Sequence, residues 1–133
     1  MALLAKPIVA LGFGLFFLCA VTCAHFDQLT TSPLSIGPDW AVGLFLTIAG
    51  FLSNRDWAKG YPYQVAAWAA LTSLLFGSVV GNFEDWRSEP WAGGTVGLVS
   101  MSQGLYLAVV GLLFVVALGG LIASLRARDS GPH

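Results

Sequence analysis

Charged side chains are scarce in this chain of 133 residues. They make up 10% of it, whereas a soluble domain has about 25%. Much of the surface is therefore not expected to face water, and the mean hydropathy of +0.77 agrees. The formal net charge is −1. No basic surface is available for a nucleic acid, so we expect no nucleic-acid partner.

Cysteine and the common catalytic motifs are also scarce or missing. The two cysteines, Cys19 and Cys23, are four residues apart in an apolar run. On a helix they share a face one turn apart, which suits neither a mutual disulfide nor a four-ligand zinc site. We interpret both as small packing residues. The chain has no phosphate-binding glycine loop, no G-x-S-x-G and no H-E-x-x-H, so we expect no enzyme, no metal site and no cofactor.

Long apolar segments dominate what is present. A spanning helix needs about 20 mostly apolar residues. Lipid offers no water to unpaired backbone groups, which favours helices for such continuous apolar runs. We therefore predict an all-α integral membrane protein, a four-transmembrane-helix bundle with short loops. It forms a single domain over residues 1–133, with a polar tail at 126–133 and spans at 7–26, 38–54, 62–82 and 95–125.

Basic residues between the segments predict the orientation. Lys6, Arg55, Lys59, Arg126 and Arg128 all fall on one side of a four-span chain. Cytoplasmic loops carry the excess of Lys and Arg, so we expect both termini in the cytoplasm and the chain in a bacterial inner (plasma) membrane. An alternative reading of residues 1–24 is a signal peptide that is cleaved after Ala24.

Small residues within the predicted spans suggest helix–helix contacts. Gly77 and Gly81 form a GxxxG pattern, while Ser100 and Gly104 lie four residues apart with Gln103 on the same face. Small residues let helices approach closely in lipid. The contacts predicted are either within the chain or with a partner. Gln103 needs hydrogen-bonding partners if buried, and an alternative role for it is ligand binding.

Charge is concentrated between the third and fourth segments. Glu84, Asp85 and Arg87 lie there, with Trp86 and Trp91 on either side of Arg87. We interpret this stretch as an external loop anchored by tryptophans at headgroup depth. The alternatives are a partner-docking surface and a cation contact.

One histidine lies close to a span. His25 is near the outer end of the first segment. We interpret it as an interfacial residue, and the alternative is a ligand to a haem or pigment.

The leading hypothesis for function is a non-enzymatic accessory or assembly subunit of a larger membrane complex. Its partners would be the lipid bilayer and either other membrane subunits or further copies of itself. One alternative is a holin-like or channel-forming homo-oligomer that permeabilises the membrane. Another is a membrane subunit that binds a small molecule, pigment or haem with His25 and the outer tryptophans.

Overall fold

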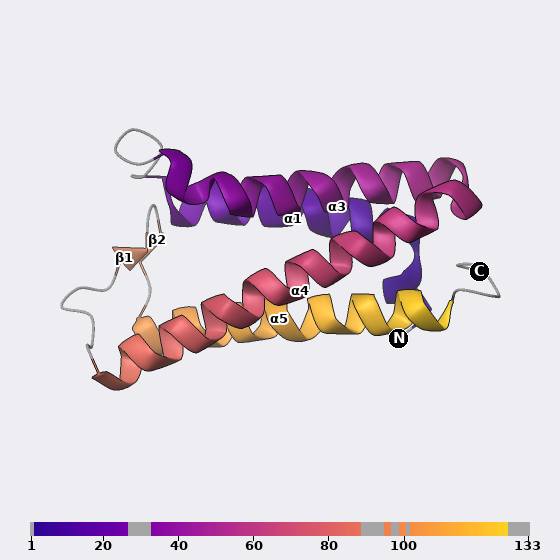
Figure 1. Cartoon of the computed structure of the whole chain (residues 1–133). Coiled ribbons are helices and arrows are strands. Elements are labelled where there is room, and N and C mark those ends of the chain that lie inside the picture. The colour runs from indigo at the N-terminus through magenta and orange to yellow at the C-terminus, as the bar shows by residue number, and fades with distance from the viewer. Residues whose placement is uncertain (1, 27–32, 89–94, 97–98, 101, 128–133) are drawn as a thin grey trace.

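The computed structural model describes residues 2–26, 33–88, 95–96, 99–100 and 102–127 (Figure 1). Its four α-helices are α1 (Pro7–Ala24), α3 (Gly37–Arg55), α4 (Trp57–Ser88) and α5 (Gln103–Arg126). The short elements are two 3-10 turns, η1 (Ala2–Ala5) and η2 (Pro33–Ile36), and two antiparallel two-residue strands, β1 (Thr95–Val96) and β2 (Val99–Ser100). The predicted helical architecture is confirmed. Three helices, α1, α4 and α5, are long and apolar enough to cross a membrane.

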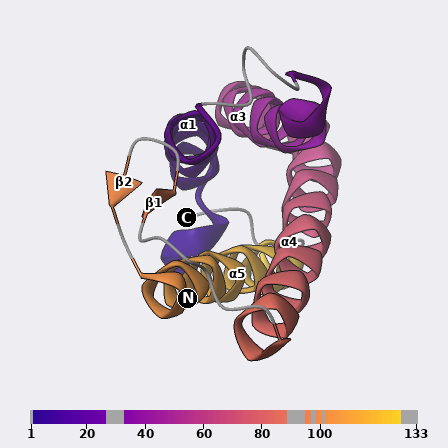
Figure 2. The ribbon, with the colours of Figure 1, turned by 90° about the vertical axis from the view of Figure 1, so that its left-hand side faces the viewer.

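The four helices follow one another around an open arc (Figure 2). In chain order, α1 packs on α3, α3 on α4 and α4 on α5, whereas α1 and α5 make almost no contact with each other. Consecutive helices run antiparallel (Figure 1). Because α1 and α5 hardly touch, the first and the last helix of the arc are not packed against each other.

Local sequence signals set the helix starts. Pro38 stands in the first turn of α3 with Asp39 beside it. Proline suits this position because its missing N–H would have no partner there, and an acidic residue complements the helix dipole. Ser102 begins α5, because its hydroxyl accepts a hydrogen bond of 3.1 Å from the amide of Leu105.

The third predicted segment, 62–82, is too short at both ends. In the structure α4 covers Trp57–Ser88 and is about 48 Å long. Pro62 does not begin this helix. It lies in the second turn, where its missing N–H removes one early hydrogen bond of the helix. Residues 83–88, expected in a loop, continue the helix. The fourth segment, in contrast, becomes helical only at Gln103.

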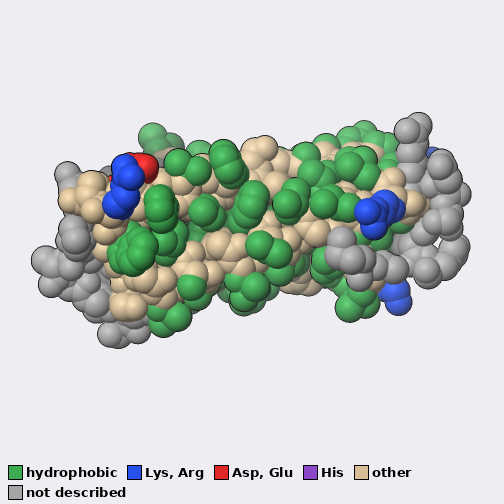
Figure 3. Space-filling model, turned by 90° about the horizontal axis from the view of Figure 1, so that it is seen from below, with side chains coloured by type: hydrophobic (Ala, Val, Ile, Leu, Met, Phe, Trp, Pro, Cys, Tyr) green, Lys and Arg blue, Asp and Glu red, His purple; other side chains and the backbone are tan. Residues whose placement is uncertain are grey.

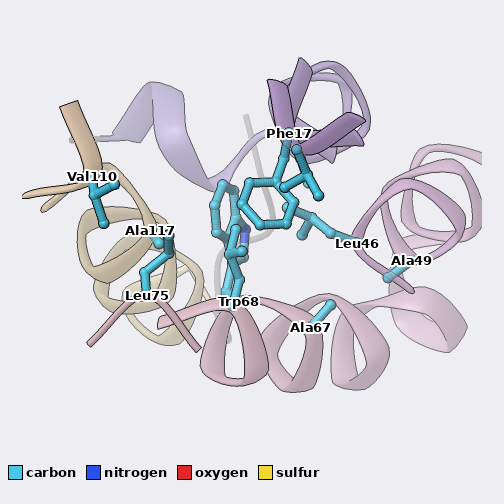
Figure 4. Packing of buried hydrophobic residues seen from close by; sticks show 11 residues of the cluster. Phe17, Leu46, Ala49, Ala67, Trp68, Leu75, Val110 and Ala117 are labelled. Carbon is cyan, nitrogen blue, oxygen red and sulfur yellow. The ribbon is translucent and has the colours of Figure 1, made fainter. Parts of the chain in front are cut away.

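Trp68 occupies the centre of the arc. It is fully buried, and its ring lies 5.5 Å from that of Phe13 on α1. On its other side Gly120 of α5 leaves room for the indole, because a Cβ there would meet the ring at 2.6 Å. Figure 4 shows side chains of this core pointing toward the indole from the surrounding helices. Trp68 therefore packs between α1 and α5, which make almost no contact with each other.

The two ends of the arc differ in charge. The end formed by the start of α1, the α3–α4 junction and the end of α5 carries Lys6, Arg55, Lys59 and Arg126, and we call it the basic end. The opposite end carries Asp39, Glu84, Asp85 and Arg87, and we call it the acidic end. Figure 3 shows charged side chains near both ends of one face, with hydrophobic side chains over the length between them.

A buried amide closes the basic end. The Nε2 of Gln64 donates to the carbonyl of Ala5 at 2.9 Å and to the hydroxyl of Ser124 at 3.3 Å. Gln64 and Ser124 are both fully buried. These hydrogen bonds connect η1 and α5 to α4. The sequence did not predict them, because Gln64 lies in an apolar run.

Candidate functional site

A cavity of about 440 Å³ lies at the acidic end of the arc, and all four helices contribute to its walls. It fills the region where α1 and α5 do not pack against each other. Its apolar walls come mainly from Phe17 and Val21 of α1, Leu75 of α4, and Val110 and Leu113 of α5. Four polar side chains share this lining, namely His25, Asp39, Ser78 and Tyr106.

Asp39 is the acidic group of the cavity. It lies in the first turn of α3, where Pro38 fixes the start of the helix, and it is partly buried. Its carboxylate interacts electrostatically with His25 at the end of α1 and with Tyr106 near the start of α5. Three helix ends distant in sequence thus bring three titratable side chains together. The sequence did not single out Asp39 as part of a site.

His25 lies where α1 ends. Its amide donates to the carbonyl of Val21 at 2.9 Å, and its partly buried side chain faces the cavity. The sequence singled out His25 as a candidate ligand, and the structure places it in this wall. Asp27, its nearest acidic neighbour in sequence, lies outside the described residues.

Ser78 and Tyr106 were not singled out as parts of a binding site. Asn82, one turn after Ser78, donates to the carbonyl of Ser78 at 2.7 Å and to its hydroxyl at 3.4 Å. Tyr106 is partly buried, and its amide donates to the carbonyl of Ser102 at 2.9 Å within the first turn of α5. Only the fold could bring Ser78 and Tyr106 to the same cavity.

The chemistry of these walls suits binding of a molecule with an apolar body and a polar head. Small-molecule sites are mostly apolar, with a few polar groups that fix the orientation of the ligand. Among the described residues, no three His, Cys, Asp or Glu side chains are close enough together to hold a metal ion. His25 and Asp39 therefore offer a hydrogen-bonding group and a charged group to the polar head of a bound molecule.

The small residues that the sequence predicts at helix contacts do not line the cavity. A Cβ added to Gly77, Gly81 or Gly104 would meet nothing within 4 Å, so these residues make no close contact with another helix in the described part of the chain. Gln103 is buried at the start of α5, as expected for an amide with partners. Ser100 lies in β2, and its side chain is outside the described part of the chain.

The close contacts inside the chain use other glycines. Gly14 of α1 lies against Thr47 of α3, and Gly50 of α3 lies against Leu11 of α1. These contacts repeat along the antiparallel α1–α3 pair.

The charged stretch between the third and fourth segments is not part of the cavity. Glu84, Asp85, Trp86 and Arg87 lie exposed on the last turns of α4. Arg87 pairs with Glu84 at 3.4 Å, one turn earlier in the helix. Trp91 lies outside the described residues.

The cysteines are both exposed and free. Their interpretation as packing residues is therefore wrong. Cys23 lies at the edge of the cavity, whereas Cys19 does not line it. This difference makes Cys23 a natural reporter of the cavity and Cys19 its control.

Similarity to known proteins assigns no function to this chain, so the cavity and the helix surfaces are the observations that bear on its function. Comparisons with protein-family models, curated proteins and solved structures find no match for this chain.

Proposed function

We propose that this chain is a four-span integral membrane protein whose cavity at the acidic end binds a small lipid-soluble molecule. The cavity itself is the observation that supports this proposal. Its volume of about 440 Å³ is within the range of about 300–1,000 Å³ that small-molecule sites occupy. Its walls are apolar except for the few polar groups around His25 and Asp39.

The position of the cavity supports entry from the lipid. Cys23 of α1 and Val109 of α5 both line the cavity and are also exposed on the surface. They lie on the two helices that make almost no contact with each other. In a bilayer, a molecule dissolved in the acyl chains would therefore enter between α1 and α5.

The proposal includes α3 as the fourth span. Its 19 residues make it about 28 Å long, close to the thickness of a bilayer core of about 30 Å. It packs along α1, and Leu44, Ile48 and Phe51 are exposed on its outer face. Its charged residues, Asp39 and Arg55, lie in the first and last turns.

Orientation and location follow from the distribution of basic residues. Lys6, Arg55, Lys59 and Arg126 are at one end of the arc. The positive-inside rule therefore favours placing the basic end and both termini in the cytoplasm, and the cavity near the outer surface of a bacterial inner membrane.

A binding role is preferred to catalysis because of the surroundings of the polar groups. Within the described residues, the hydroxyl of Ser78 is contacted by Asn82 rather than by His25. Activation of a serine requires a base within hydrogen-bonding reach. We therefore propose a protein that binds and releases its ligand unchanged.

The two cysteines provide the test of ligand binding. In lipid nanodiscs, Cys23 and Cys19 are alkylated with N-ethylmaleimide, with and without the neutral aromatic probe triphenylphosphine oxide, and each site is quantified by mass spectrometry. The proposal predicts that the probe slows alkylation of Cys23 and leaves Cys19 unchanged. Equal slowing of both thiols, or of neither, would contradict it.

A matched pair of variants links this effect to the cavity. Ala20 lines the cavity, whereas Ala108 is exposed on α5 and does not line it. Ala20→Phe fills the space with a ring, so the probe should no longer change the alkylation rate of Cys23. Ala108→Phe should leave the effect of the probe intact.

A second candidate function is an accessory or assembly subunit of a larger membrane complex. The supporting observation is the open space at Gly77 and Gly81 of α4 and at Gly104 and Gly111 of α5. Glycines on such surfaces permit close approach of another helix. The neighbour is either a different subunit or a second copy.

Purification in mild detergent tests this second function. Other subunits should co-purify in fixed ratio with the wild-type chain and be lost from a Gly77→Leu, Gly81→Leu double variant. Recovery of the wild-type chain as a monomer, without other subunits, would contradict it. A homo-oligomer that collapses the membrane potential on expression would instead favour the holin-like alternative.

A further inference from the structure

We infer that the molecule bound in the cavity is an organic cation with an apolar body, held by its charge against the carboxylate of Asp39. This inference rests on the proposed function, because it specifies the chemical class of the ligand in the same cavity. It is carried by the formal charge of the lining, by the aromatic groups around it and by the charges at the acidic end.

The formal charge of the lining is negative. Asp39 is the only acidic residue among the side chains that line the cavity, and no lysine or arginine is among them. His25 is the one side chain of basic character in the lining, and it interacts electrostatically with Asp39. The ion pairs among the described residues are Lys59–Asp56 and Arg87–Glu84, and neither involves Asp39. A carboxylate that is partly withdrawn from water favours a compensating positive charge.

The walls around Asp39 suit an organic cation better than a metal ion. Phe17 and Tyr106 contribute aromatic rings to the lining, and the face of such a ring attracts a cation within about 6 Å. Calcium would need 6–8 oxygen ligands, whereas most of this surface is aliphatic or aromatic carbon. An apolar cation gains from both the charge and the walls.

The surface near the cavity favours the approach of cations. Glu84 and Asp85 project from the last turns of α4 at the acidic end, against the single cation Arg87. All three side chains are exposed. Clusters of one sign speed the arrival of ligands of the opposite sign, whereas a single exposed carboxylate adds little to the affinity at equilibrium.

The test uses tetraphenylphosphonium as the probe, because this cation is lipid-soluble and aromatic. Its binding to the full chain in nanodiscs is measured by equilibrium dialysis of the radiolabelled ion. The wild type should bind it saturably. Asp39→Asn, which removes the charge and keeps the shape, should weaken the affinity by about tenfold or more. Asp39→Glu, which keeps the charge, should restore most of the affinity.

Two controls separate the cavity from the surface and from misfolding. Glu84→Gln removes a carboxylate at the same end but outside the cavity, so it should leave the dissociation constant within about twofold. Triphenylphosphine oxide should still protect Cys23 in Asp39→Asn, which shows that the cavity of this variant remains intact.

The outcomes distinguish this inference from the proposed function. If Asp39→Asn binds the cation as tightly as the wild type while the neutral probe still protects Cys23, the cation inference is wrong and the cavity remains a binding site. If the wild type favours the neutral probe over the cation, a neutral hydrogen-bonding head is the correct class. If neither probe acts on the wild type, the proposed function fails together with the inference.

Discussion

The α1–α3 contact depends on the absence of a side chain at Gly14. A Cβ at this position would lie 2.7 Å from the amide nitrogen of Thr47 and 3.0 Å from its Cα, whereas ordinary contact begins at 3.4 Å. Thr47 is held in place, because its hydroxyl donates to the carbonyl of Gly43 at 2.8 Å. Gly14→Ala therefore requires α1 and α3 to separate by about 0.7 Å, enough to forfeit about a quarter of the dispersion attraction between the facing atoms.

Gly12 gives the matched control, since a Cβ there would meet nothing within 4 Å. Both substitutions gain the same helix propensity of about 1 kcal/mol, so the difference between them isolates the packing. We expect Gly14→Ala to be less stable than Gly12→Ala by about 1–3 kcal/mol, the usual range for overpacking.

The assay is reversible unfolding in mixed micelles, with sodium dodecyl sulfate as denaturant and helix content followed by circular dichroism. Gly12→Ala should match or exceed the wild type in free energy of unfolding, and Gly14→Ala should fall below it. Equal stability of the two variants would refute the close contact between α1 and α3 at Thr47.

Three further predictions concern the core, the basic end and the topology. Trp68→Ala removes a fully buried indole and should lower the free energy of unfolding by about 3 kcal/mol or more. Trp86→Ala, on the exposed end of α4, should change it by less than about 0.5 kcal/mol. Similar losses in both variants would contradict the placement of Trp68 in the core. Gln64→Leu removes the hydrogen bonds to η1 and α5, so it should accelerate amide hydrogen exchange in α5 near the basic end. Exchange at the wild-type rate would show that these hydrogen bonds do not stabilise the end of α5. In a chain without its native cysteines, Leu34→Cys should react with an impermeant maleimide from outside and Lys59→Cys only from the cytoplasm; labelling of both from one side would show that α3 does not cross.

The helical class was predictable from sequence because continuous apolar runs leave few other structures in lipid. Helix ends were less predictable. Residues such as Glu84 and Arg87 are polar, so they were assigned to a loop, yet they continue α4. Polarity marks where a chain leaves the apolar region, and a helix can continue beyond that point. Pro62 misled because proline is typical of the first turn of a helix, whereas Pro62 lies inside α4.

The candidate site was mostly not predictable. His25 was singled out by its residue type. Asp39 and Tyr106 become candidate site residues only because three helix ends meet in the fold. The cavity exists because α1 and α5 do not pack together, and no local pattern encodes a missing contact. The glycine patterns illustrate the same limit, because Gly77 and Gly81 carry the motif while Gly14 makes the close contact.

The central claim is that the space between α1 and α5 at the acidic end holds a molecule. Native mass spectrometry of the chain released from nanodiscs made from its host membrane tests this claim most directly. We predict a bound species of constant mass on the wild type and on Ala108→Phe, and its loss from Ala20→Phe, whose added ring fills the cavity. The same set of masses on all three proteins, or no bound species on the wild type, would contradict the account.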